Sequence, residues 1–110
     1  MAIVNAQLTT TQLDMITVPA SKSYAITNIM VCNNGSTPAS FDMHFVPQSS
    51  SLSNSVTRVI NSLELPVGET FTFDSERIVL EVGDKLSFVA EPDAGAGLTA
   101  LSATVSYLEV

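Results

Sequence analysis

The sequence has few of the residue types that carry most protein chemistry. It contains one cysteine, Cys32, one histidine, His44, and no tryptophan. A lone cysteine cannot form an internal disulfide, and one histidine with one cysteine is too few for a typical zinc site. No Gly-x-Ser-x-Gly element presents a nucleophilic serine. We therefore expect a non-enzymatic protein with no catalytic residues, no metal ligands and no cofactor.

Charge is also scarce, and most of it has one sign. Charged residues make up 14% of the 110 residues, against about 25% in typical soluble domains. A net charge of -7 argues against a nucleic-acid or anionic-membrane binder, because an acidic surface repels phosphate. No apolar run reaches the roughly 18 residues of a membrane span, and the first residues lack the basic start of a signal peptide. We expect neither nucleic acid nor membrane as a partner.

Serine, threonine and apolar residues take the place of the missing charges. The chain has 14 serines, 11 threonines and 45% hydrophobic residues, and its mean hydropathy is +0.33. A small isolated domain usually solvates its surface with charged side chains. This composition favours a protein whose surface is partly covered, in a homo-oligomer or in a larger assembly. The alternative is a monomer coated with serine and threonine.

Two segments repeat one pattern 15 residues apart. Residues 65–73 read Leu-Pro-Val-Gly-Glu-Thr-Phe-Thr-Phe, and residues 80–88 read Leu-Glu-Val-Gly-Asp-Lys-Leu-Ser-Phe. Each is a glycine turn leading into a strand in which apolar and polar residues alternate. With about eight or nine strands separated by turn signals, residues 1–110 are predicted to form one all-β domain. The expected architecture is an antiparallel two-sheet β-sandwich, immunoglobulin-like or jelly-roll, with residues 1–20 as edge strands or an attachment arm.

Residues 24–33 form the longest β-rich run of the first half. One face is expected to hold Tyr24, Ile26, Met30 and Cys32. Ile29 and Val31 make the other face apolar too, as in a central or covered strand. Cys32 is then most simply a small buried hydrophobe. Residues 55–65 have helical spacing but strand composition, and we favour a strand because they lead directly into the first repeat.

The strand expected at residues 40–46 holds the one histidine. Alternation directs Asp42 and His44 outward into solvent, where neither is expected to have a catalytic or metal-binding role. The same alternation predicts the sandwich core, which we expect to contain Phe41, Phe45, Phe71, Phe73, Leu86 and Phe88.

The acidic residues of the turns are the remaining candidates for a metal site. No Asp-x-Asp-x-Asp-Gly loop surrounds them, so the sequence leaves a structural calcium open without favouring it. The acidic residues that follow Gly68 and Gly83 are expected to accept backbone N–H bonds in their turns. The calcium candidates are Asp74, Glu76, Asp84 and Asp93.

The expected C-terminal strand, residues 98–110, is apolar on both faces. One row of its side chains can join the domain's own core, whereas the second row would have to be covered by a partner. We predict that this second row lies at a subunit or virion interface, in a homo-oligomer such as a trimer. The interface candidates are Leu98, Ala100, Leu108 and Val110.

Three segments carry a resemblance to a known group of proteins. They are 24–33 (Tyr-Ala-Ile-Thr-Asn-Ile-Met-Val-Cys-Asn), 68–74 (Gly-Glu-Thr-Phe-Thr-Phe-Asp) and 105–110 (Val-Ser-Tyr-Leu-Glu-Val). From about residue 20 onward, the chain resembles small β-sandwich structural proteins of tailed bacteriophages, particularly those of cyanobacteria. The resemblance implies a virion component without catalytic residues, made in the host cytoplasm and bound to other capsid or tail proteins.

The resemblance leaves the place in the virion open. A capsid decoration or cement protein is the leading interpretation, and a tail, baseplate or fibre-associated module is the alternative. A carbohydrate- or receptor-binding module is the alternative from another class. It is weakened by the absence of tryptophan and the presence of only two tyrosines, because sugar sites usually stack rings on aromatic side chains.

Overall fold

The computed structural model describes residues 2–35, 38–53, 55–73, 78–91 and 98–110, with the backbone alone at residues 98–100. These residues form nine strands and no helix, which confirms the all-β prediction. The described part therefore contains no long apolar helix that would cross a membrane. The strands are β1 (Ala2–Thr9), β2 (Leu13–Thr17), β3 (Tyr24–Asn33), β4 (Ala39–Val46), β5 (Arg58–Leu65), β6 (Thr70–Phe73), β7 (Ile78–Leu80), β8 (Lys85–Ala90) and β9 (Leu98–Glu109).

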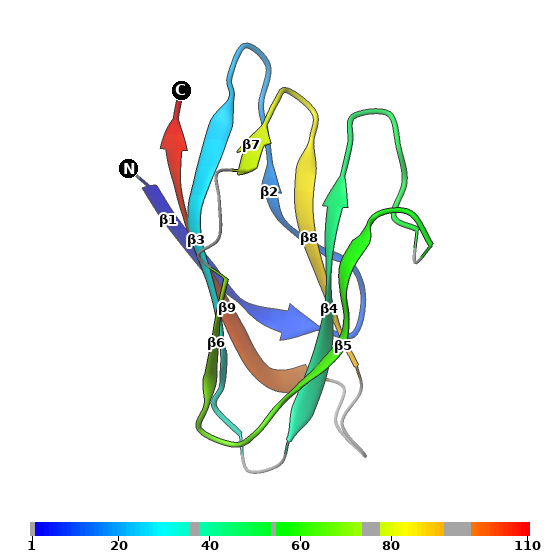
Figure 1. The fold of residues 1–110 in the computed structure, drawn as a ribbon, viewed down its shortest axis with the longest axis vertical. Coiled ribbons are helices and arrows are strands. Elements are labelled where there is room, and N and C mark those ends of the chain that lie inside the picture. Colours follow the sequence, from blue (N-terminus) through cyan, green and yellow to red (C-terminus); the bar gives the residue numbers. More distant parts are fainter. Residues whose placement is uncertain (1, 36–37, 54, 74–77, 92–97) are drawn as a thin grey trace.

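The strands form two antiparallel sheets packed face to face (Figure 1). Sheet A has the order β1-β9-β3-β6, and β7 also pairs with β3. Sheet B has the order β2-β8-β4-β5. Apolar side chains that alternate along the strands fill the space between the sheets, as the sandwich prediction requires.

The connections between strands identify the topology. Strands β6 and β7 pair with successive segments of β3, so they act as one interrupted strand. With these two counted as one, every connection except β4–β5 passes from one sheet to the other. An immunoglobulin-like sandwich keeps several consecutive strands in the same sheet. The order seen here is that of a jelly roll with two four-stranded sheets.

The predicted core residues divide into two groups. Phe41, Leu86 and Phe88 are completely buried between the sheets. The other three predicted residues are only partly buried and pack against the margin of the core. Two of these lie on β6, a four-residue strand at the edge of sheet A, where the phenylalanine rings are partly exposed. The partly buried residues are Phe45, Phe71 and Phe73.

A bulge in β3 changes which residues face the core. The register of β3 against β9 shifts between Ile26 and Asn28. As a result Ile26 is buried together with Ile29, while Met30 is exposed on the opposite face. The expectation that Ile26 shares a face with Met30 and Cys32 is therefore wrong. Cys32 is partly exposed on the outer face of sheet A and is not a core residue.

Candidate functional site

The outer face of sheet A spans β1, β9, β3 and the edge strands β6 and β7, and its described rows carry no charged side chain. Its rows follow from the strand register, with each residue beside its partner on the next strand. Four rows lie across β3: Asn5–Thr104–Met30–Thr72, Gln7–Ser102–Cys32–Thr70, Ile3–Ser106–Asn28 and Leu108–Ala25–Val79. None of these residues is acidic or basic, although the whole chain carries a net charge of -7.

Some of the polar groups on this face are paired with one another. The hydroxyls of Thr27 and Ser106 lie 2.6 Å apart. Asn34 Nδ2 donates to Ser102 Oγ at 2.9 Å, and Cys32 Sγ donates to Asn34 Oδ1 at 3.4 Å. Covering a polar group costs little free energy when its hydrogen bond is already made. These three contacts therefore lower the cost of desolvating this part of the face.

Exposed apolar side chains are interspersed among these hydroxyls. Ile3 is 67% exposed, Val79 is 52% exposed, and Met30 and Leu108 are each 38% exposed. A protein surface without charge that combines paired hydroxyls with apolar groups has the composition of an interface centre, where charged residues are depleted.

Two of the four predicted interface residues can be placed. Leu108 belongs to the outer face of sheet A, and Val110 follows β9 and is exposed. The side chains of Leu98 and Ala100 lie outside the described part of the chain. Strand β9 is an inner strand between β1 and β3, so a partner would have to cover its face rather than pair with its edge. Its role as an interface stays a prediction.

Sheet B carries charged pairs on its outer side, in contrast to sheet A. Lys85 Nζ lies 3.8 Å from Asp14, and Arg58 lies 3.7 Å from Asp42. Partial burial alone would raise the pKa of Asp14, but hydrogen bonds with Ser87 and Gln12 and the charge of Lys85 lower it overall. The two broad surfaces of the sandwich therefore differ in electrostatic character.

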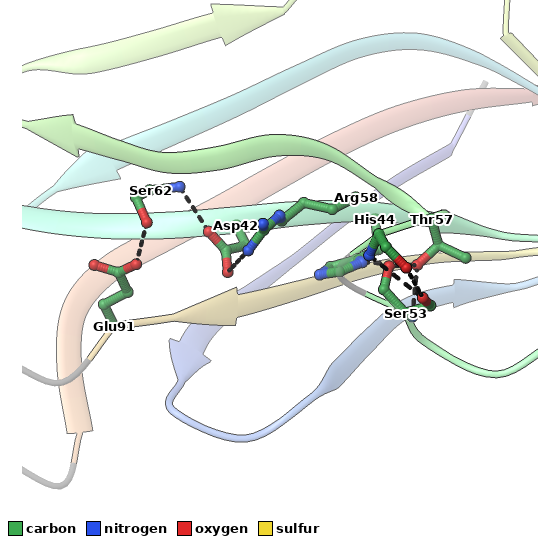
Figure 2. A network of polar contacts seen from close by, with 8 residues as sticks. Asp42, His44, Ser53, Thr57, Arg58, Ser62 and Glu91 are labelled. Carbon is green, nitrogen blue, oxygen red and sulfur yellow. Dashed lines mark hydrogen bonds and ion pairs between the residues drawn. The ribbon is translucent and has the colours of Figure 1, made fainter.

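His44 is buried, which contradicts its expected position in solvent (Figure 2). It points away from the sandwich core, but the chain between β4 and β5 folds over it. His44 Nδ1 lies 2.8 Å from Thr57 Oγ1, and that hydroxyl donates to the carbonyl of Ser53 at 2.9 Å. Alternation in a strand indicates which side of the sheet a residue is on, but not whether a loop covers that side.

This contact network determines the tautomer of His44. Because the hydroxyl proton of Thr57 is given to Ser53, His44 Nδ1 must donate its own proton to Thr57 Oγ1. Nε2 is then the bare ring nitrogen, and it is buried without a hydrogen-bond partner among the described residues. Burial lowers the pKa of His44, and the charge of Arg58 lowers it further while Asp42 opposes the shift. The imidazole is therefore held neutral.

Asp42 is buried as well, again contrary to expectation, because β5 and its side chains cover it. Its carboxylate accepts the backbone N–H of Ser62 at 2.6 Å and faces Arg58 (Figure 2). Ser62 in turn donates its hydroxyl proton to Glu91. Asp42 thus directs its oxygens toward β5 rather than toward His44, so the two do not form the aspartate–histidine contact of a hydrolytic triad. These contacts hold β4 and β5 together and have no feature of a catalytic site.

The acidic turn residue Asp84 behaves as expected. Its carboxylate accepts the backbone N–H groups of Gln48 at 2.9 Å and Glu81 at 3.0 Å. Within the described residues, no three histidine, cysteine or acidic side chains gather closely enough to hold a metal ion. The remaining calcium candidates, Asp74, Glu76 and Asp93, lie outside the described residues.

One small hollow opens near Asp84. It has a volume of about 90 Å³ and is mainly apolar. Ligand pockets usually measure about 300–1,000 Å³, so this hollow is too small for a substrate or cofactor. Its lining residues are Phe45, Val46, Pro47, Leu80 and Asp84.

Comparisons of the chain with protein-family models, with curated proteins and with solved structures found no match. Fold and surface together define a class of protein, a jelly-roll β-sandwich with one broad uncharged face and one charged face.

Proposed function

We propose that this protein is a non-enzymatic structural component of a virus particle that decorates the capsid. In this proposal it attaches to other virion proteins through the outer face of sheet A. The observation that carries the proposal is that the described residues of this face include no acidic or basic side chain, in a protein of net charge -7. Charged residues are depleted at the centres of interfaces, because burying an unpaired charge is costly.

Two further features support an attachment role. Hydrogen bonds among the hydroxyls of the face lower the cost of covering it. Jelly rolls also recur among viral capsid and lectin domains, although a fold alone does not determine a function. The resemblance of the sequence to phage structural proteins supports a virion component over a lectin, without deciding between capsid and tail.

Recognition of sugars is supported less well. Sugar sites usually offer an exposed aromatic ring for stacking. The rings of Tyr24 and Tyr107 pack against each other, with centroids 4.5 Å apart, and both residues are half-buried. The chain has no tryptophan to take their place.

The proposal is tested with purified particles of the virus that encodes this chain. Mass spectrometry of the particles and cryo-electron microscopy with a labelled copy should find the protein on the capsid. Its absence from the particles would overturn the proposal. Density on the tail would overturn the capsid assignment and show that the protein belongs to the tail or baseplate.

A pair of matched variants tests the attachment face. Met30→Arg places a charge in the middle of the outer face of sheet A, and Val59→Arg places the same charge on an exposed position of sheet B. We expect Met30→Arg to reduce binding to particles at least tenfold and Val59→Arg to leave it unchanged. Equal binding by both variants would exclude this face.

A further inference from the structure

Strand β1 has an open edge. Of the described strands only β9 pairs with it, in unbroken register from Ala2 to Gln7. The opposite edge of the segment from Ala2 to Ala6 faces no other strand of the described chain (Figure 1). A strand edge presents a row of unpaired N–H and C=O groups, which is a template for pairing with another strand.

The other edges of the two sheets carry the features that normally prevent such pairing. Strand β2 is five residues long and has an acidic residue, Asp14, beside a register shift. Strand β5 has two register shifts, a positive φ of 51° at Ser62, and the charged residues Arg58 and Glu64. The far edge of sheet A is divided between β6, with four residues, and β7, with three. Charges, bulges and short lengths all discourage edge pairing.

Strand β1 has none of these features in its first six residues. The segment Ala-Ile-Val-Asn-Ala-Gln contains no charge, proline or glycine. Its inner row, Ala2, Val4 and Ala6, is only half-buried at the margin of the core. A strand that paired with this edge would extend the sheet and cover the exposed part of this row.

The chemistry of the edge indicates what would pair with it. A suitable strand is uncharged and has small apolar residues at alternate positions, since it must continue the inner row. Strand β1 of a second copy meets this requirement. Two such strands related by a two-fold axis at Val4 are antiparallel, and Ile3 lies opposite Asn5 of the second copy. Although each chain carries a net charge of -7, this contact brings no like charges together.

We propose that two copies of this protein associate by antiparallel pairing of their β1 strands about a two-fold axis. The two A sheets then form one continuous sheet, and their uncharged outer faces lie side by side. This inference does not depend on what the outer face binds. Because the paired segment is short, the dimer is weak and depends on concentration.

The test is the sedimentation of the isolated protein at increasing concentration. We expect the mean mass of the wild type to rise from that of a monomer toward that of a dimer as the protein concentration increases to about 1 mM. A dissociation constant of about 1 mM is typical of a very weak complex. The double variant I3K/N5K places lysines on both sides of the axis, and we expect it to remain monomeric. Since these lysines reduce the net negative charge, a general charge effect would instead strengthen association. The control V59K/N61K makes the same change in charge on β5 and should dimerise like the wild type.

Hydrogen exchange provides a measurement that needs no variant. Within residues 2–6, the amides that point away from β9 should become protected as the wild-type concentration rises, while those of β5 should not change. A wild type that stays monomeric up to about 1 mM, or β1 exchange that is independent of concentration, would overturn the proposal. Met30→Arg should dimerise normally, so a failure of particle binding and a failure of dimerisation are distinguishable.

Discussion

The turns at Gly68 and Gly83 are held by the same pair of backbone hydrogen bonds. Each turn connects one sheet of the sandwich to the other. The amide of Gly68 donates to the carbonyl of Asn33 at 3.1 Å, and the amide of Asn33 donates to the residue after the glycine at 3.0 Å. Gly83 and Val18 repeat this arrangement at 3.0 and 3.1 Å. The first turn carries the chain from sheet B to sheet A, and the second carries it back. The two copies of the sequence repeat thus form the same kind of turn between the sheets.

Alanine should be less well tolerated at Gly83 than at Gly68. Both glycines have positive φ, +83° and +78°, a conformation that costs an alanine about 1–2 kcal/mol. At Gly83 the new Cβ would also lie 2.6 Å from Cγ of Gln48, whereas at Gly68 no atom lies within 4 Å. In urea denaturation we expect a loss of about 1 kcal/mol for Gly68→Ala and about 2–4 kcal/mol for Gly83→Ala.

A second substitution separates the steric effect from the backbone strain. Gln48→Ala removes the Cγ that Gly83→Ala would meet. In this background Gly83→Ala should therefore cost less than in the wild type, in a double-mutant cycle. Equal losses for Gly68→Ala and Gly83→Ala would mean that Gln48 moves aside without cost.

The strands were predictable from the sequence because their signals are local. The run 24–33 coincides with β3, and most of the ambiguous segment 55–65 forms a strand, β5, which begins at Arg58. Alternation also identified Phe41, Leu86 and Phe88, which are three of the fully buried core residues. The choice of the jelly roll was not predictable, because turn signals do not reveal which sheet the next strand joins.

The environment of the candidate residues depended on features that alternation does not encode. A register shift after Ile26 reverses the faces of β3, and it leaves Cys32 outside the core. The loop over His44 is polar in sequence, yet its residue Thr57 provides a hydrogen bond that allows the imidazole to be buried. The absence of charge from the described rows of the outer face of sheet A follows from the strand register, which the sequence alone does not give.

His44→Ala should destabilise the protein, although the residue has no predicted role in binding. The side chain is completely buried and holds Thr57, so its removal leaves a cavity and an unpaired hydroxyl acceptor. We expect a loss of about 2–4 kcal/mol in the free energy of unfolding. A urea midpoint equal to that of the wild type would show that the β4–β5 loop does not cover His44 in solution.

The stability of the protein should fall as the pH drops from about 7.5 to about 5.5. In the unfolded chain His44 takes up a proton near its ordinary pKa of about 6.5. Burial lowers the pKa of His44 in the folded state, so in this range the unfolded chain binds more protons. The free energy of unfolding therefore decreases with decreasing pH. Thermal unfolding at several pH values measures the effect.

A histidine-free variant provides the control for this pH dependence. His44 is the one histidine of the chain, so His44→Gln removes it without leaving another imidazole. The decline in stability over this pH range should be much smaller in His44→Gln than in the wild type. The same decline in both proteins would assign the effect to other groups.

Truncation of the aromatic core residues should distinguish the centre of the sandwich from its margin. Phe88 is completely buried and contacts Phe41, with ring centroids 6.2 Å apart, whereas Phe73 lies partly exposed on the short edge strand β6. We expect Phe88→Ala to cost about 3–5 kcal/mol and Phe73→Ala about 1–3 kcal/mol, because a partly exposed site leaves a smaller cavity. Urea midpoints of the two variants measure the difference. A larger loss for Phe73→Ala would mean that a partner or another part of the chain covers β6.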